Sequence, residues 1–237
     1  MVPHHLAIIM DGNRRWAKQR RLEILRGHNQ GSSVLKEISK SAHDKGISYL
    51  TVFAFSTENW KRPQAEVKGL IELMRRFLMQ DMESLITDNV KLRIIGDISV
   101  FDQDLQALFE DAMAQTAAND GLNLSIAVNY GGKQDLMQAL SSLAGDELSH
   151  AEGTEEAVKV RLQTKELPNI DLLVRTGGEY RISNFILWES AYAELYFTDC
   201  YWPDFSEAEL DKALEAFEGR KRRFGGDDMP QQSSKKA

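Results

Sequence analysis

The chain has 237 residues, enough for one sizeable α/β domain or two small ones. Its 36 acidic residues outnumber its 29 lysines and arginines, which argues against a general nucleic-acid-binding protein, because such proteins need a basic face. No apolar run approaches the roughly 20 residues that a membrane-spanning helix requires.

Six segments have the composition of β-strands. Each is a short run rich in β-branched, aromatic or other apolar residues, bounded by polar or turn-forming residues. The predicted strands are residues 6–10, 49–55, 91–96, 122–128, 170–174 and 194–197.

Helical periodicity fills the intervals between these strands. The predicted helices are residues 30–45, 64–87, 105–118, 131–143, 154–163 and 207–218, the last capped by Ser206. Residues 145–153 are expected to form a loop, and the polar end from Gly225 is expected to be disordered. The alternation predicts an α/β fold, a single domain with a mostly parallel six-stranded sheet and helices on both faces.

The helix predicted at residues 64–87 carries a long apolar stripe. As one helix it would be about 35 Å long. Such a stripe either packs into the core or forms the wall of an elongated apolar cleft. Its members are Val67, Leu70, Ile71, Met74, Phe77, Leu78, Met82, Leu85 and Ile86.

A carboxylate and a crowd of basic residues follow the first strand. Asp11 ends the strand, and Gly12-Asn13 can turn sharply or start a helix. Arginines can fork onto phosphate oxygens while a carboxylate holds a metal ion, so the pattern suits a magnesium-bound phosphate ester. A solvated basic helix with an N-terminal aspartate explains the same spacing. The basic residues are Arg14, Arg15, Lys18, Arg20, Arg21 and Arg26, with His28 after them.

Most of the remaining chemistry-bearing residues also follow predicted strands. In parallel sheets ligands bind at the carboxyl ends of the strands, so these residues are expected to share one rim. The sequence has no P-loop, no G-x-G-x-x-G fingerprint and no Cys/His metal cluster. The rim residues are Asp11, Ser56, Glu58, Asn59, Trp60, Arg62, Asn129, Arg175, Glu179, Arg181 and Ser183.

Seven motifs in a fixed order carry a family resemblance that spans residues 5–226. The chain resembles the cis-prenyltransferases, and within them the bacterial undecaprenyl diphosphate synthases. The resemblance implies a catalytic domain over residues 1–226, a tail at 227–237 and a hydrophobic tunnel for the prenyl chain. The motifs are HLAIIMDGNRRWAK, GH at 27–28, TVFAFSTENWKRP, LRIIGD, NYGG, DLLVRTGGEYRISNF and AYAELYFTD.

The resemblance assigns catalytic and metal roles to three residues. Asp11 would hold Mg²⁺ and assist departure of the allylic diphosphate, and Glu194 resembles a second magnesium carboxylate near the same diphosphate. Asn59 matches a residue often assigned as proton acceptor. An uncharged amide is a poor base, so we interpret Asn59 as a positioning residue, with the released diphosphate as the alternative acceptor.

Substrate-binding roles follow from the same resemblance. The allylic diphosphate would be cradled by Gly12, Asn13, Arg14, Arg15 and His28, with Trp16 bordering the prenyl group. The mobile loop over the substrates would contain Ser56, Thr57, Glu58, Trp60 and Arg62. The isopentenyl diphosphate site would be formed by Arg175, Arg181, Ile182 and Ser183.

Two positions depart from the bacterial pattern. Arg14 stands where those enzymes usually have glycine, and arginine would be strained there if the backbone needed positive φ. Ile24 stands where the family usually has an arginine that contacts the diphosphate. Arg20 and Arg21 are close enough along a helix to substitute for it.

The implied activity is the condensation of isopentenyl diphosphate with farnesyl diphosphate in cis, giving undecaprenyl diphosphate for the lipid carrier of peptidoglycan synthesis. Different product lengths, or a weakened member that acts as a binding or partner subunit, are the alternatives. A homodimer is expected. The single cysteine, Cys200, and the absence of a signal peptide suggest the cytoplasm, with possible peripheral contact at the inner membrane into which the product partitions.

Overall fold

The computed structural model describes residues 2–143 and 151–220. Its centre is one sheet of six strands, with the order β3-β4-β2-β1-β5-β6 and every neighbouring pair parallel. The predicted parallel α/β domain is confirmed. The strands are β1 (His5–Ile9), β2 (Tyr49–Ser56), β3 (Lys91–Ile95), β4 (Asn123–Tyr130), β5 (Leu172–Arg175) and β6 (Glu194–Phe197).

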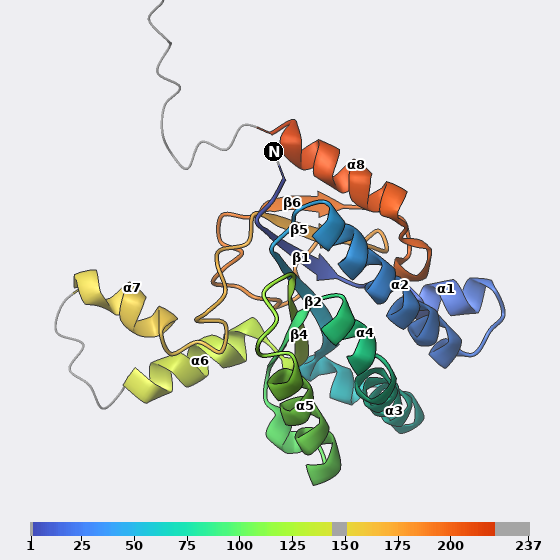
Figure 1. The fold of residues 1–237 in the computed structure, drawn as a ribbon, viewed down its shortest axis with the longest axis horizontal. Coiled ribbons are helices and arrows are strands. Elements are labelled where there is room, and N and C mark those ends of the chain that lie inside the picture. The colour runs from blue at the N-terminus through green and yellow to red at the C-terminus, as the bar shows by residue number, and fades with distance from the viewer. Residues whose placement is uncertain (1, 144–150, 221–237) are drawn as a thin grey trace, which may run out of the picture.

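Helices that lie together in Figure 1 cover one face of this sheet. Their apolar stripes and the strand residues that point toward them form the main core, which includes Ile38, Leu70, Phe109 and Leu210. Parallel sheets are buried in this way because crossover connections place helices on their faces. The helices are α2 (Ile24–Asp44), α3 (Gln64–Gln80), α4 (Met82–Thr87), α5 (Gln103–Gln115) and α8 (Glu207–Glu218).

The opposite face packs largely against the irregular segment that connects β5 to β6, residues 176–193. Phe185 and Ile186 of this segment are fully buried against Ile9 and Leu173 of the central strands. Two helices, α6 (Gly132–Leu143) and α7 (Ala151–Lys159), extend to one side in Figure 1 and share a small core of their own. Helices therefore cover less of the second face than the alternating pattern predicts.

The prediction of one continuous helix over residues 64–87 is wrong, because the structure has two helices there. It ends at Gln80, and α4 begins at Met82 after Asp81, whose backbone has φ −108°. The carboxylate of Asp81 contacts Lys36 of α2. Leu78 of α3 and Leu85 of α4 are both buried in the main core, so the apolar stripe continues across the break.

Helix α2 begins six residues earlier than predicted, because glycines inside it look like a helix break in the sequence. A Cβ atom at Gly27 would lie 2.2 Å from the carbonyl oxygen of Asn13. The glycine thus allows the short helix α1 (Asn13–Gln19) to cross closely over α2, and this crossing brings Asn13 and His28 to one place.

Other sequence predictions have mixed outcomes. Residues 151–153 of the loop expected at 145–153 belong to α7, and its residues 145–150 lie outside the described part of the chain, as does the tail from Gly225. Ser206 occupies the cap position of α8 but its side chain makes no capping hydrogen bond.

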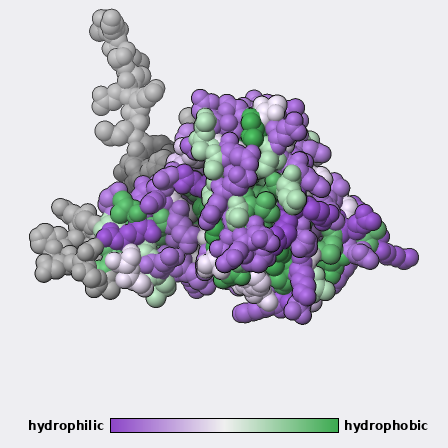
Figure 2. Space-filling model, turned by 60° about the horizontal axis from the view of Figure 1, so that its bottom comes forward, coloured by the Kyte–Doolittle hydropathy of each residue, from purple (hydrophilic) through white to green (hydrophobic). Residues whose placement is uncertain are grey.

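No helix among the described residues is long and apolar enough to cross a membrane. The face in Figure 2 is mostly hydrophilic, with scattered hydrophobic residues.

Candidate active site

A cavity of about 620 Å³ lies at the carboxyl ends of the central strands. Its mouth is polar and its interior is apolar, a combination typical of sites that hold amphiphilic ligands. The polar lining includes Asp11, Asn13, His28, Ser56, Glu58, Asn59, Arg62, Arg175, Ser183 and Asn184. The apolar lining includes Ala54, Leu70, Leu73, Met74, Phe77, Leu78, Ile94, Phe109 and Val128.

Sheet register places Arg175 beside the end of β1. Arg175 is the partner of Ile9 in the β1–β5 pair, and Asp11 lies two residues further on. The Nη2 atom of Arg175 donates to Oδ2 of Asp11 at 2.9 Å, while its Nη1 donates to Oγ of Ser183 at 2.6 Å. Only 4% of Arg175 is exposed, so this guanidinium is fixed at the base of the mouth.

The second oxygen of Asp11 has its own donors. Oδ1 accepts from the backbone N–H of Gly12 at 2.6 Å and lies 3.2 Å from Nη2 of Arg15. Burial by itself would raise the pKa of the Asp11 carboxyl, but the hydrogen bond from Arg175 and the charge of Arg15 outweigh it, so the pKa lies below its ordinary value. Asp11 is therefore ionised at neutral pH.

Gly12 has the unusual backbone that the turn after Asp11 requires. Its φ is 108°, and a Cβ atom there would lie 2.7 Å from the Tyr201 ring. The next residues are helical, so Arg14 lies inside α1 and not in the left-handed region. The strain considered for arginine at this position is absent.

A second cluster surrounds Glu66, whose side chain is 5% exposed. Its Oε1 accepts from Nη1 of Arg62 at 3.1 Å and lies 3.6 Å from Nε2 of His28. Its Oε2 lies 3.5 Å from Nε of Arg14. Sequence reasoning missed Glu66, although a carboxylate four residues after Arg62 on the apolar stripe of α3 was an available signal.

His28 is neutral in this environment. Burial, followed by the charge of Arg62, lowers its pKa to about 4, and the carboxylate of Glu66 opposes the change only in part. The imidazole therefore lines the cavity without a charge of its own.

Residues 56–62, predicted as a loop, contain a short 3₁₀ helix, η1 (Thr57–Lys61). Oδ1 of Asn59 accepts from the backbone N–H of Ser56 at 3.2 Å, which orders the turn. Nε1 of Trp60 donates to Oδ1 of Asn129 at 2.8 Å, and its ring contacts Phe55. These contacts attach η1 to the end of β4 above the cavity.

Residues near the fifth strand extend the mouth. The carboxylate of Glu179 bridges Arg15, at 3.3 Å, and Arg181, at 2.6 Å. Asn184, which the sequence did not single out, donates to Oε1 of Glu58 at 3.4 Å and so connects this segment to η1. Ile182 packs against the core beneath the segment.

Trp16 lies away from the cavity. Its Nε1 donates to Oδ1 of Asp204 at 2.7 Å, and Arg20 lies over its ring at 4.4 Å. Arg20 also forms an ion pair with Asp204 at 2.9 Å. Arg20 is therefore occupied elsewhere, and only Arg21 of the two proposed substitutes for the missing arginine at Ile24 lacks such a partner among the described residues.

Glu194 is also not brought to the site within this chain. It pairs with Leu172 at the start of β6, whereas Asp11 lies beyond the opposite end of the sheet. At about 3.3 Å per residue this separation is on the order of 15 Å along the strands. The side chain of Glu194 contacts Arg220 at 2.7 Å. Within one chain Glu194 is thus far from Asp11, and its assignment as a second magnesium carboxylate stays a prediction.

Asp11 is the carboxylate that best fits a magnesium ion here. No group of three or more His, Cys, Asp or Glu residues in the described chain forms a metal cluster. Mg²⁺, however, is often held by one or two carboxylates together with substrate phosphates. An ionised Asp11 at a mouth lined by arginine and histidine fits that arrangement.

Comparisons with known proteins agree with this geometry. The prenyltransferase family model described as "Putative undecaprenyl diphosphate synthase" matches residues 9–225. An isoprenyl transferase of Ralstonia nicotianae is 45% identical, over 94% of this chain and 87% of that protein. Another isoprenyl transferase, of Chromobacterium violaceum, is 48% identical, over 94% of this chain and 88% of that protein.

Solved structures show the same architecture. Lavandulyl diphosphate synthase from Lavandula x intermedia, in complex with dimethylallyl diphosphate, has a TM-score of 0.90 and 37% identity, covering 94% of this chain and 98% of that one. A probable undecaprenyl diphosphate synthase from Campylobacter jejuni has a TM-score of 0.79 and 32% identity, with the same coverage. The chain therefore belongs to the undecaprenyl diphosphate synthase family of isoprenyl transferases.

Proposed function

We propose that this protein elongates farnesyl diphosphate with isopentenyl diphosphate, in cis, to undecaprenyl diphosphate for the lipid carrier of peptidoglycan synthesis. The observation that carries the proposal is the cavity itself, in which anion-binding side chains at the mouth lead directly to an apolar interior. That division matches a substrate with a charged head and a hydrocarbon tail.

The mouth offers two groups of anion-binding residues. His28 and Arg62, with Arg14 behind them, lie on the side of α2 and α3, where they would hold the allylic diphosphate. Arg175 and Ser183, with Arg181 near them, lie on the side of β5 and would hold isopentenyl diphosphate. Asp11 contacts Arg175 of the second group, and it also contacts Arg15, which the family resemblance assigns to the allylic diphosphate.

The chemical step needs stabilisation of a departing diphosphate. Asp11 would hold the Mg²⁺, which neutralises charge that develops on the leaving oxygens. The arginines orient the two head groups so that the isopentenyl double bond faces the allylic carbon. The allylic carbon–oxygen bond breaks as diphosphate departs, and a carbon–carbon bond forms to the terminal carbon of isopentenyl diphosphate. A proton then leaves the carbon next to the CH2–O group, which creates the new double bond, and the product is one isoprene unit longer.

Asn59 suits a positioning role in this step. Its amide oxygen is already engaged by the Ser56 backbone N–H, and a neutral amide is a weak base. The released diphosphate is the better proton acceptor. Asn59 then keeps η1 ordered over the mouth, with Glu58 and Trp60 attached to neighbouring segments.

The apolar interior would receive the growing chain. Ala54 of β2 lies on one wall, and Met74 and Phe77 of α3 lie on another. The apolar stripe of α3 thus faces this cavity as well as the core, so both interpretations of the stripe apply. We also propose a homodimer, and a cytoplasmic setting with peripheral membrane contact for product delivery.

Incubation of the protein with Mg²⁺, farnesyl diphosphate and labelled isopentenyl diphosphate, followed by sizing of the lipid product, tests the proposal. A product of undecaprenyl length supports it fully. A shorter product would overturn the proposed length but keep the transferase reaction. No incorporation of label would overturn the enzymatic role and favour a binding or partner subunit.

A further inference from the structure

One buried carboxylate at the cavity mouth contacts two arginines and a neutral histidine. Arg14 comes from α1, His28 from α2 and Arg62 from the segment before α3, and all three converge on Glu66. The distances from the Glu66 oxygens to nitrogens of these residues are 3.5, 3.6 and 3.1 Å respectively. Side chains from three elements of the fold thus meet at a single carboxylate.

Glu66 stands behind the residues that a ligand would touch. His28 and Arg62 line the cavity, whereas Glu66 does not. Its Oε2 atom and the Nε2 atom of His28 have no hydrogen-bond partner among the described residues, because their contacts exceed hydrogen-bonding distance. Buried polar atoms of this kind are costly unless another group satisfies them. The cluster therefore has one hydrogen bond, from Arg62 to Glu66, and its contacts with Arg14 and His28 are longer.

The same basic residues are those that the proposed function assigns to the allylic diphosphate. A diphosphate in the mouth would compete with Glu66 for Arg62 and His28. The site is poorly screened because Glu66 is 5% exposed, so its negative charge acts on an anion a few ångströms away. That charge repels the anion while it orients the cations, and the two effects oppose each other.

We propose that Glu66 is a positioning residue that serves as the counter-charge to the allylic diphosphate, and this inference rests on the proposed function. It holds Arg14, His28 and Arg62 in place before substrate arrives. It also limits the affinity of the mouth for anions, so that inorganic diphosphate leaves after the bond has formed. Removal of the charge is expected to tighten diphosphate binding and to slow release.

Glu66→Gln keeps the shape of the side chain and removes its charge. The dissociation constant of inorganic diphosphate, measured by titration calorimetry, is expected to fall about tenfold. In steady-state assays the KM for farnesyl diphosphate and kcat should fall together, because release becomes slower. A purely structural role would weaken diphosphate binding or leave it unchanged, so either of those results would overturn the proposal.

Glu72→Gln is the matched control. Glu72 lies on the same helix with a side chain that is 67% exposed, and its contact is with Arg75 outside the cavity. Its diphosphate affinity should equal that of the wild type. If the control tightens binding as much as Glu66→Gln does, the effect comes from overall charge and the proposal is wrong.

Glu66→Asp covers the possibility that Glu66→Gln does not fold. The shorter side chain keeps the charge but withdraws it from Arg14 and His28, so a smaller tightening is expected, and no tightening contradicts the inference. The affinity for diphosphate can be measured without catalytic turnover. The test of Glu66 is therefore separate from the test of the transferase activity. Failure of the wild type to incorporate label refutes the proposed function, whereas unchanged affinity in both Glu66 variants refutes only the role of Glu66.

Discussion

Arg175 and Asp11, 164 residues apart in sequence, meet through a hydrogen bond of 2.9 Å from Nη2 to Oδ2 at the ends of two adjacent parallel strands. The guanidinium is almost completely buried and the carboxylate is partly open to the cavity. Arg175 therefore orients Asp11, and both lie where the two proposed diphosphate groups meet.

Asp11→Asn should lower kcat by orders of magnitude while the fold survives. The amide oxygen can still accept from Arg175, so the buried guanidinium keeps a partner, but the negative charge needed for Mg²⁺ is lost. Turnover at saturating Mg²⁺ and the thermal midpoint should be measured together. A rate near that of the wild type would remove Asp11 from the proposed mechanism.

Ile24→Arg should tighten binding of the allylic substrate. Ile24 is the first residue of α2, one turn before His28, and Arg20 cannot compensate because it contacts Asp204. A charge-assisted contact to phosphate contributes about 1.5–3 kcal/mol, so the KM for farnesyl diphosphate should fall about tenfold or more.

Arg20→Ala and Arg21→Ala accompany that variant. Arg20→Ala should leave KM unchanged, since the side chain is partnered away from the cavity. If Arg21→Ala raises KM and Ile24→Arg gains nothing, then Arg21 already fills the role of the missing arginine.

Ala54→Leu should shorten the lipid product. Ala54 lies on the wall of the cavity at β2, and a larger side chain there removes space from the growing chain. The rate of the first condensation should change less than the product length does. An unchanged product distribution would mean that the chain does not pass this wall.

Glu189 should make stability fall as pH rises. Burial raises its pKa to about 7, although a hydrogen bond from Thr164 opposes the change. Between the ordinary value of 4.5 and about 7, the folded protein holds a proton that the unfolded chain has released. The associated stability is fully present below that window and is lost above it, at a cost of about 3 kcal/mol.

The comparison with Glu189→Gln isolates this effect. His5 and His28 act in the opposite direction, because burial lowers each pKa to about 4 and stability then falls as pH drops below the ordinary value of 6.5. The difference in unfolding free energy between wild type and variant removes those shared contributions. A pH-independent difference from pH 4 to pH 8 would show that folding does not raise the pKa of Glu189.

The composition of the strand segments made the sheet predictable. The alternation of strands and helices made the parallel direction of its strands predictable. The break at Asp81 was not predictable, because the apolar spacing continues across it from Leu78 to Leu85. The early start of α2 was hidden because Gly27 looks like a helix break until its close contact with Asn13 is known.

The site was predictable where residues follow strand ends, as with Asp11 and Arg175. Glu66 was missed because its role depends on the convergence of three elements, which no local spacing displays. The distance between Glu194 and Asp11 within one chain was not predicted, although Glu194 is the first residue of the predicted strand 194–197; the register with Leu172 shows it.

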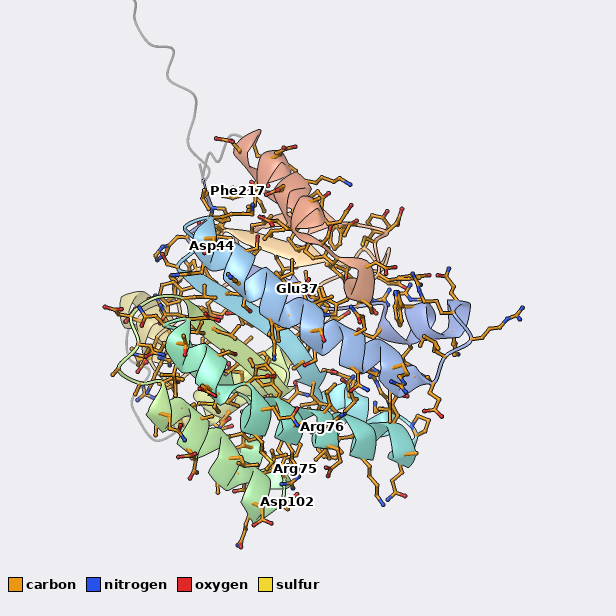
Figure 3. The ribbon with its side chains drawn as sticks, turned by 45° about the vertical axis from the view of Figure 1, so that its right-hand side comes forward. Glu37, Asp44, Arg75, Arg76, Asp102 and Phe217 are labelled. Carbon is orange, nitrogen blue, oxygen red and sulfur yellow. The ribbon has the colours of Figure 1, made fainter. Side chains whose placement is uncertain are left out.

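Surface charges away from the site form pairs that no motif predicts. Figure 3 shows Arg75 and Asp102 on α3 and at the start of α5, where their side chains contact each other. Exposed pairs of this kind contribute little to stability, about 0.2–1 kcal/mol, so we expect variants there to leave the cavity and its chemistry unchanged.

A crystal structure with farnesyl diphosphate bound tests the central claim most directly. The account predicts that the diphosphate lies among Asp11, His28 and Arg62, with the farnesyl chain in the apolar cavity between β2 and α3 beside Ala54 and Phe77. A diphosphate bound outside that mouth, or a hydrocarbon chain that lies along the surface and leaves the cavity unfilled, would contradict it.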